Sequence, residues 1–229
     1  MFNIEGLGDL IVATGALGTA SFALVDGSKA FRGGISNFGF THIENAVKRF
    51  LSHSVASDPV SPLSLESVLD TLKASWLNGV PLADQRAIAK SLIKLSLSPS
   101  SAALFAKAAA VDAEILRQVA SKIASGATES LTPEESDIYG RFDLLLTATL
   151  DHGYQRADQT YRNSAKACSI VLSVVLALIG VHAVYPVVQG EQYLLAFLLG
   201  LAATPIAPIA KDLTNALAAG AKVVQKMRK

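Results

Sequence analysis

The feature that most limits how this chain can fold is a long apolar segment, residues 167–210, in which Glu191 is the only charged residue. Residues 167–190 form a run of 24 positions without Asp, Glu, Lys or Arg, and residues 193–210 form another run of 18. Because an α-helix rises about 1.5 Å per residue, roughly 20 apolar residues are enough to cross the hydrocarbon core of a bilayer. Residues 186–192, at the end of the first run and in the gap before the second, include Pro, Gly and Gln, which are typical of a turn. The segment therefore predicts a hairpin of two transmembrane helices.

A third, shorter apolar run lies near the N-terminus, at residues 10–25. Its 16 uncharged residues are few for a span, but the helix can extend past Asp9 and Asp26 if their carboxylates lie among the lipid headgroups. No Lys or Arg precedes the run, so it lacks the basic region of a secretory signal peptide and is expected to be retained. Small residues recur at every fourth position, which places them where another helix can approach closely. These predicted helix-packing residues are Gly15, Thr19, Ala23 and Gly27.

The distribution of basic residues predicts the orientation of the chain in the membrane. All 20 Lys and Arg residues lie within residues 29–166 or 211–229. Three spans put these two segments on the same side, and the positive-inside rule makes that side cytoplasmic. We therefore expect a multi-pass protein of the cell inner (cytoplasmic) membrane, with its N-terminus outside and its C-terminus cytoplasmic. If residues 10–25 do not span, the N-terminus lies inside and the other placements stay the same.

Between the first span and the hairpin, apolar residues recur with helical periodicity and are interrupted by Pro and Gly. We expect residues 31–40 to be a Gly-rich interfacial connector, because Gly33, Gly34 and Gly39 interrupt a helix. The helices expected after it cover residues 41–53, 64–78, 81–95, 98–109 and 112–126.

The next helix has the clearest start signal in the chain. Thr132 and Glu135 have the spacing of a capping box, in which each side chain bonds the backbone amide of the other residue. After Pro133 the sequence has no proline until the turn of the hairpin. One helix can therefore run from the polar region into the second span, with Gly140 and Gly153 as its predicted weak points.

These features predict an all-α integral membrane protein with three transmembrane helices and a small helical cytoplasmic domain inserted between the first and second spans. The predicted parts are an N-terminal transmembrane helix (1–30), a Gly-rich interfacial connector (31–40), a helical cytoplasmic domain (41–132), a juxtamembrane helical stalk (133–166), a transmembrane helical hairpin (167–210) and a basic amphipathic C-terminal tail (211–229).

Few residues of the membrane segments are functional candidates. His182 is an ionisable side chain inside an apolar span, which suggests a gating or proton-linked role. The plainer alternative is a neutral histidine that hydrogen-bonds a neighbouring helix or headgroup. Pro205 and Pro208 predict a helix kink in the third span, because proline removes a backbone donor. The tail can lie on anionic membrane lipid, or it is an ordinary solvated basic terminus. Its predicted lipid-surface residues are Lys222, Lys226, Arg228 and Lys229.

No motif indicates an enzyme. The four histidines lack partners at metal-ligand spacing, and no serine lies in a nucleophile motif. We therefore expect no catalytic, cofactor-binding or metal site. Residues 41–166 carry 13 Lys and Arg against 14 Asp and Glu. Because this balance gives no basic field for a phosphate backbone, we expect no nucleic-acid partner.

The sequence favours a non-enzymatic inner-membrane scaffold or adaptor that presents a helical domain at the cytoplasmic face. We expect it to form a homo-oligomer, to contact membrane lipid and to bind a cytoplasmic protein partner. The alternative is a homo-oligomeric channel or pore gated by the helical domain. The first span, with its small and hydroxyl residues, is compatible with both functions.

Overall fold

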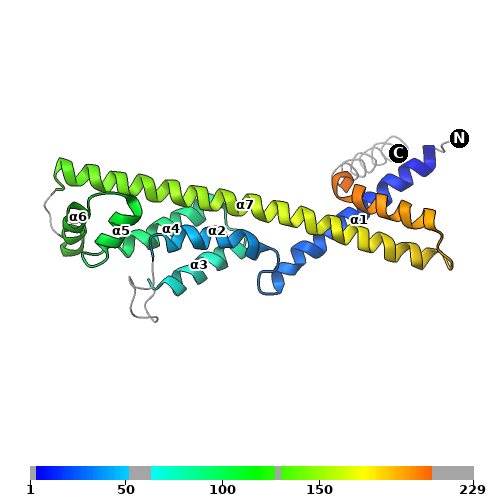
Figure 1. Cartoon of the computed structure of the whole chain (residues 1–229), viewed down its shortest axis with the longest axis horizontal. Helices are drawn as coiled ribbons and strands as arrows, with labels where there is room; N and C mark the ends of the chain where they lie inside the picture. The colour runs from blue at the N-terminus through cyan, green and yellow to red at the C-terminus, as the bar shows by residue number, and fades with distance from the viewer. Residues whose placement is uncertain (1–3, 52–62, 127–129, 208–229) are drawn as a thin grey trace, which may run out of the picture. The chain divides into compact units, whose positions relative to one another are not determined.

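In the computed structural model of the chain, the structure describes residues 4–51, 63–126 and 130–207 (Figure 1). Of the described residues, 83% are helical and none lies in a strand, which confirms the all-α prediction. The chain divides into two compact units. We call residues 1–35 and 162–229 the membrane unit, and residues 36–161 the helical domain.

Within its described residues, the helical domain contains five complete helices and the first part of a sixth, which continues into the membrane unit. They are α2 (Ser36–Lys48), α3 (Leu65–Leu77), α4 (Leu82–Leu95), α5 (Ala102–Ala109), α6 (Ala113–Ser125) and α7 (Pro133–Val184).

Side-chain caps start several of these helices where the sequence predicts them. The Ser64 hydroxyl accepts from the Ser67 amide at 3.2 Å, and Asp112 Oδ1 accepts from the Ile115 amide at 2.9 Å. The capping box of α7 is confirmed. The Thr132 amide donates to Glu135 Oε2 at 2.7 Å, and the Glu135 amide donates to Thr132 Oγ1 at 3.2 Å. Such caps satisfy amides that have no partner inside the helix.

Two helix starts differ from the prediction. α2 begins at Ser36, so the second half of the expected connector is helical and Gly39 lies inside the helix. A Cβ added to Gly39 would lie 2.6 Å from the carbonyl oxygen of Ala157, so this glycine permits close packing and does not end the helix. α5 begins at Ala102 and not at residue 98; the predicted N-cap Ser98 does accept from the Ser101 amide at 3.2 Å, but residues 99–101 form a turn before the helix.

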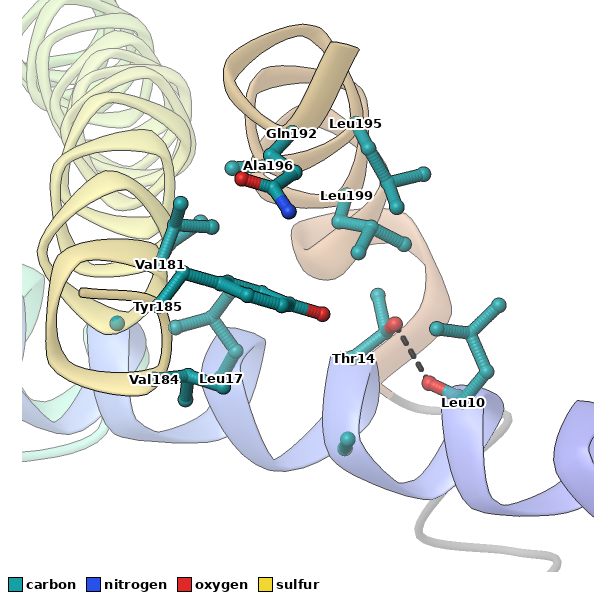
Figure 2. A pocket seen from close by; sticks show the side chains of 13 residues that line it. Leu10, Thr14, Leu17, Val181, Val184, Tyr185, Gln192, Leu195, Ala196 and Leu199 are labelled. Carbon is teal, nitrogen blue, oxygen red and sulfur yellow. Dashed lines mark hydrogen bonds between the residues drawn. The ribbon is translucent and has the colours of Figure 1, made fainter. Parts of the chain in front are cut away.

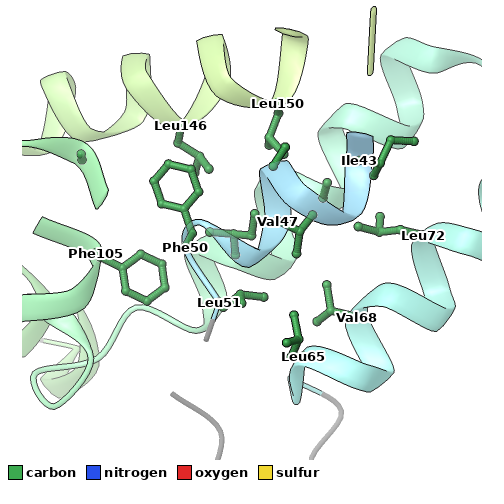
Figure 3. Close-up of a cluster of buried hydrophobic side chains, with 14 of the residues drawn as sticks. Ile43, Val47, Phe50, Leu51, Leu65, Val68, Leu72, Phe105, Leu146 and Leu150 are labelled. Atoms are coloured by element: carbon green, nitrogen blue, oxygen red, sulfur yellow. The ribbon is translucent and has the colours of Figure 1, made fainter. Parts of the chain in front are cut away.

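The core of the helical domain is a cluster of large apolar side chains (Figure 3). Phe50, Phe105 and Phe142 form its aromatic centre, with ring centroids 5.9 to 6.4 Å apart. They come from the turn after α2, from α5 and from α7, so three separate parts of the chain contribute to one shared core. Burying a side chain of this size stabilises a fold by about 1.5–3 kcal/mol relative to leaving it exposed.

α7 is a single unbroken α-helix of 52 residues, as the absence of proline predicts. At 1.5 Å per residue it is about 78 Å long. It runs without interruption through Gly140 and Gly153, so neither expected weak point breaks it. Gly153 is instead a packing residue, because an added Cβ would lie 2.7 Å from Ala46 Cβ of α2.

The membrane unit contains three candidate membrane-spanning helices, as the sequence predicts. Its elements are α1 (Ile4–Gly27), the short 3₁₀ helix η1 (Ser28–Ala30), the second part of α7, and the helix Gly190–Ala207. Large apolar side chains point outward from it, for example Val171 at 63% and Leu194 at 60% exposure. Three apolar helices with such exposed surfaces indicate a membrane protein, in which lipid covers these side chains.

Candidate functional site in the membrane unit

The three spans pack through small residues. A Cβ added to Gly18 of α1 would lie 2.2 Å from the carbonyl oxygen of Ala203, and one added to Gly200 would lie 2.5 Å from Val174 Cα of α7. The helix Gly190–Ala207 therefore approaches both other spans backbone to backbone. This packing is typical of membrane helices, where van der Waals contact between small residues replaces the hydrophobic effect.

Hydroxyl groups line the same interior. Ser173 of α7 donates to Ser21 of α1 at 2.8 Å, and both side chains are fully buried. Ser21 also donates to the carbonyl of Leu17 at 2.9 Å. Ser169 and Thr204 are buried, and their hydroxyls have no hydrogen-bond partner within the described residues. We call Gly18, Ser21, Ser169, Ser173, Gly200 and Thr204 the small-residue seam.

The face of α1 that packs within the chain is not the predicted one. Gly15 is buried, but Thr19, Ala23 and Gly27 are exposed. A strict four-residue repeat drifts around a helix that has 3.6 residues per turn, whereas spacings of four and three stay on one face. The packed face follows the second pattern. Its buried residues are Thr14, Gly18, Ser21 and Val25. Association of another helix with the exposed Thr19, Ala23 and Gly27 stays a prediction.

An apolar cavity of about 570 Å³ lies between the three spans (Figure 2). Figure 2 shows the Tyr185 ring reaching toward Thr14 of α1, and the Gln192 amide pointing into the space between the helices. The Thr14 hydroxyl bonds its own helix, donating to the carbonyl of Leu10 at 2.6 Å. None of the described lining residues is charged. The cavity therefore suits hydrocarbon better than an ion.

His182 is in the last turn of α7 and contacts the third span. Its Nε2 lies 2.9 Å from the hydroxyl of Tyr193, and the two rings meet edge to face at 5.4 Å. His182 is exposed and does not line the apolar cavity. The contact ties the two helices together beside the turn, and a gating or proton-linked role stays a prediction. Pro205 lies within the helix Gly190–Ala207, while Pro208 and the predicted lipid-surface residues lie outside the described residues.

Side chains that could bind a metal or carry out redox chemistry do not form a cluster in the described part of the chain. No group of three or more His, Cys, Asp or Glu side chains there could hold a metal ion. Cys168 is exposed at the start of the second span.

Most charged groups of the helical domain form ion pairs. Asp143 of α7 accepts from Lys90 at 2.7 Å and from Lys94 at 3.0 Å, both on α4. Burial alone would raise the pKa of Asp143, but these hydrogen bonds and charges outweigh it and hold that pKa below its usual value. The ammonium of Lys122 and the Thr132 amide lower the pKa of Glu135 in the same way. These pairs join α4 and α6 to α7.

The sequence predicts the three spans but not the small-residue seam between them. The signal that could have indicated the seam is the pair Ser169 and Ser173, two hydroxyls one helical turn apart in an otherwise apolar run. In a span, polar side chains usually face other helices and not lipid.

Comparison with models of protein families, with curated protein sequences and with solved structures finds no match for this chain. What can be proposed of its function comes from its own residues.

Proposed function

We propose that the protein is a non-enzymatic inner-membrane scaffold or adaptor that presents its helical domain at the cytoplasmic face as a homo-oligomer. The observation that carries this proposal is the double role of α7. Phe142, Leu146 and Leu150 of α7 are fully buried in the core of the helical domain, and the same helix continues as a candidate span. The domain is therefore built on the helix that anchors it.

The segment between these two parts of α7 supports presentation over loose tethering. Residues 158–166 are helical and contain neither Gly nor Pro, whereas flexible linkers are rich in Gly and Ser. The cytoplasmic placement follows from the positive-inside rule. The exposed Thr19, Ala23 and Gly27 supply a surface for association between copies.

A gated channel is the second candidate function, and the buried hydroxyls favour it. Ser169 and Thr204 have no described partner inside an apolar unit, and polar groups inside a membrane often belong to a conduit. The apolar lining of the 570 Å³ cavity and the close backbone contacts at Gly18 and Gly200 favour the scaffold.

Ion flux into liposomes separates the two candidates. Liposomes that contain the full-length scaffold are expected to have the K⁺ permeability of protein-free liposomes. Because a gating domain can hold a channel closed, Gln159→Pro is measured too, with Gln159→Ala as the matched control. The proline breaks α7 before the span, at a cost of about 3 kcal/mol or more. Flux through the wild type or the proline variant would contradict the scaffold and support the channel.

Oligomerisation is tested by the mass of the purified protein in mild detergent. Thr19→Leu combined with Ala23→Leu enlarges the exposed face of α1 and is expected to reduce the oligomer to smaller species, because close approach is lost. Ala183→Leu adds a side chain at an exposed position of α7, away from this face of α1, and serves as the control. A wild-type monomer, or a double variant with unchanged mass, would refute this association surface.

Topology is tested by labelling of introduced cysteines in intact cells, in a Cys168→Ala background. Ser130→Cys is expected to react with a membrane-impermeant maleimide only after the cells are opened, whereas Gln189→Cys reacts before. External labelling of Ser130→Cys would exclude the cytoplasmic placement.

A further inference from the structure

A hollow of about 210 Å³ lies between α2 and α7 in the helical domain. At its floor the two helices touch, because Gly153 faces Ala46 where a Cβ would lie at 2.7 Å. At one side His42 Nε2 lies 3.0 Å from the hydroxyl of Thr160. Longer side chains on either side of this contact line the rest of the hollow.

The polar groups of the hollow share one chemistry. Every described polar residue that lines it carries a hydrogen-bond donor, two of them are arginines with a permanent charge, and no carboxylate is among these described residues. They are His42 and Asn45 of α2, Arg49 in the turn directly after α2, and Thr149, His152 and Arg156 of α7.

The two arginines differ from the basic groups of α4 that face α7. Arg86 pairs with Asp151 at 2.6 Å, and two lysines of α4 share Asp143. Within residues 4–51, 63–126 and 130–207, no carboxylate lies within 4.0 Å of the side chain of Arg49 or Arg156. Two like charges at one hollow repel each other, and an anion between them removes this cost.

A second hollow on α7 shows that this composition is not general to the domain. It has nearly the same size, about 220 Å³, and is lined by Arg86 and Lys90. There, however, Asp151 supplies a carboxylate and pairs with Arg86. Among the residues that the structure describes, two similar hollows on one helix therefore differ in whether a carboxylate neutralises their positive charge.

We propose that the hollow between α2 and α7 binds a phosphate group through Arg49 and Arg156. The planar guanidinium group offers paired N–H donors that match the oxygens of phosphate. Two arginine charges balance the charge of about −2 that a phosphate monoester carries near pH 7. Asn45 and Thr149 add neutral donors at the same hollow. The phosphate comes either from solution or from the headgroup of a lipid, and the two sources present the same group to these residues.

Thermal unfolding of the full-length protein in detergent tests the site. Fluorescence of Trp76, the single tryptophan, reports on the helical domain. Inorganic phosphate is expected to raise the unfolding temperature in a saturable manner, beyond sodium chloride of equal ionic strength. In parallel, nanodiscs of phosphatidylcholine are compared with nanodiscs that also contain phosphatidic acid.

The test variant is Arg49→Gln combined with Arg156→Gln, which is expected to weaken phosphate binding about tenfold or more. The control is Arg117→Gln combined with Arg141→Gln, which removes the same charge from exposed pairs with Glu114 and Asp137. If the test variant folds poorly, Arg49→Lys with Arg156→Lys keeps the charge but loses the paired donors, and it is expected to bind with intermediate affinity.

A response to inorganic phosphate that the test variant loses and the control keeps supports a site for phosphate from solution. The same pattern with phosphatidic acid alone supports a lipid headgroup as the source. No response to either probe, or an equal loss in the control, overturns the proposal.

Discussion

The helical domain and the membrane unit share α7, yet α7 buries opposite kinds of side chain in the two. In the domain it buries Phe142 and Leu146; in the membrane unit it buries Ser169 and Ser173, while Ile179 is 59% exposed. Water drives large apolar groups into the domain core. Lipid exerts no such drive, so the spans are held by close packing and hydrogen bonds between small residues. The surrounding medium, and not the helix, decides which face is inside.

Glycine has the same use in both regions. Gly39 and Gly153 let α2 and α7 approach closely in the domain, and Gly18 and Gly200 let the three spans approach in the membrane unit. The two regions therefore differ in the size of the side chains that fill the core, while both depend on close backbone contact at a few positions.

The largest effect is expected from Phe142→Ala, which removes a fully buried ring from the centre of the domain core. Large-to-small changes of this kind cost about 3–5 kcal/mol. Denaturant unfolding followed by Trp76 fluorescence measures the loss. The control is Leu144→Ala on the same helix, where the side chain is 71% exposed, and its effect is expected within about 0.5 kcal/mol. Equal losses for the two variants would mean that this face of α7 is not the core face.

A smaller effect is expected from Gly18→Val in the small-residue seam. The new side chain would collide with the backbone of Ala203, so the helices must separate. Overpacking of this kind costs about 1–3 kcal/mol, and titration with a denaturing detergent followed by circular dichroism measures it. Gly180→Val is the matched control, because a Cβ there meets nothing within 4 Å. If Gly18→Val is as stable as this control, the backbone contact is absent in the folded protein.

The smallest effect is expected from Asp143→Asn, which breaks two half-exposed pairs. Because the folded state lowers the pKa of Asp143 below its ordinary value of 3.8, the carboxylate stabilises the domain above that pH. The contribution is lost as pH falls through the lower, folded pKa. Wild type should therefore exceed the variant by at most about 1 kcal/mol at pH 7, since solvent screens these pairs. Trp76 fluorescence measures both proteins, and the difference should decline below pH 3.8 and vanish once the pH lies below the folded pKa of Asp143. A difference that persists there would assign the effect to packing.

Local signals in the sequence predict much of the fold. The capping box at Thr132 and Glu135, the N-cap Asp112 and the end of α6 at Gly126 depend on neighbouring residues alone, and all are where the sequence places them. The same holds for the three apolar helices, because a span needs only length and hydropathy.

The features that the sequence does not predict depend on tertiary contacts. Gly39 is expected to interrupt a helix, but its role is to admit the backbone of Ala157, which is 118 positions away. The seam escapes prediction because two small-residue patterns overlap on α1, and the position of Ala203 decides which of them packs. The hollow with Arg49 and Arg156 forms only when α2 and α7 meet, and no local pattern joins those arginines.

Because α7 is the last element along the chain that contributes to the domain core, the ribosome must synthesise it before the core can form. α6 ends at Ser125, but Ala157, the last core residue of α7, follows 32 positions later. At 5–20 residues per second, translation of this stretch takes about 2 to 6 seconds. During that interval Phe50 and Phe105 lack the surface of α7 that buries them, and transiently exposed apolar side chains favour aggregation. A soluble fragment for expression should therefore end no earlier than Ala157, however compact α2 to α6 look without it.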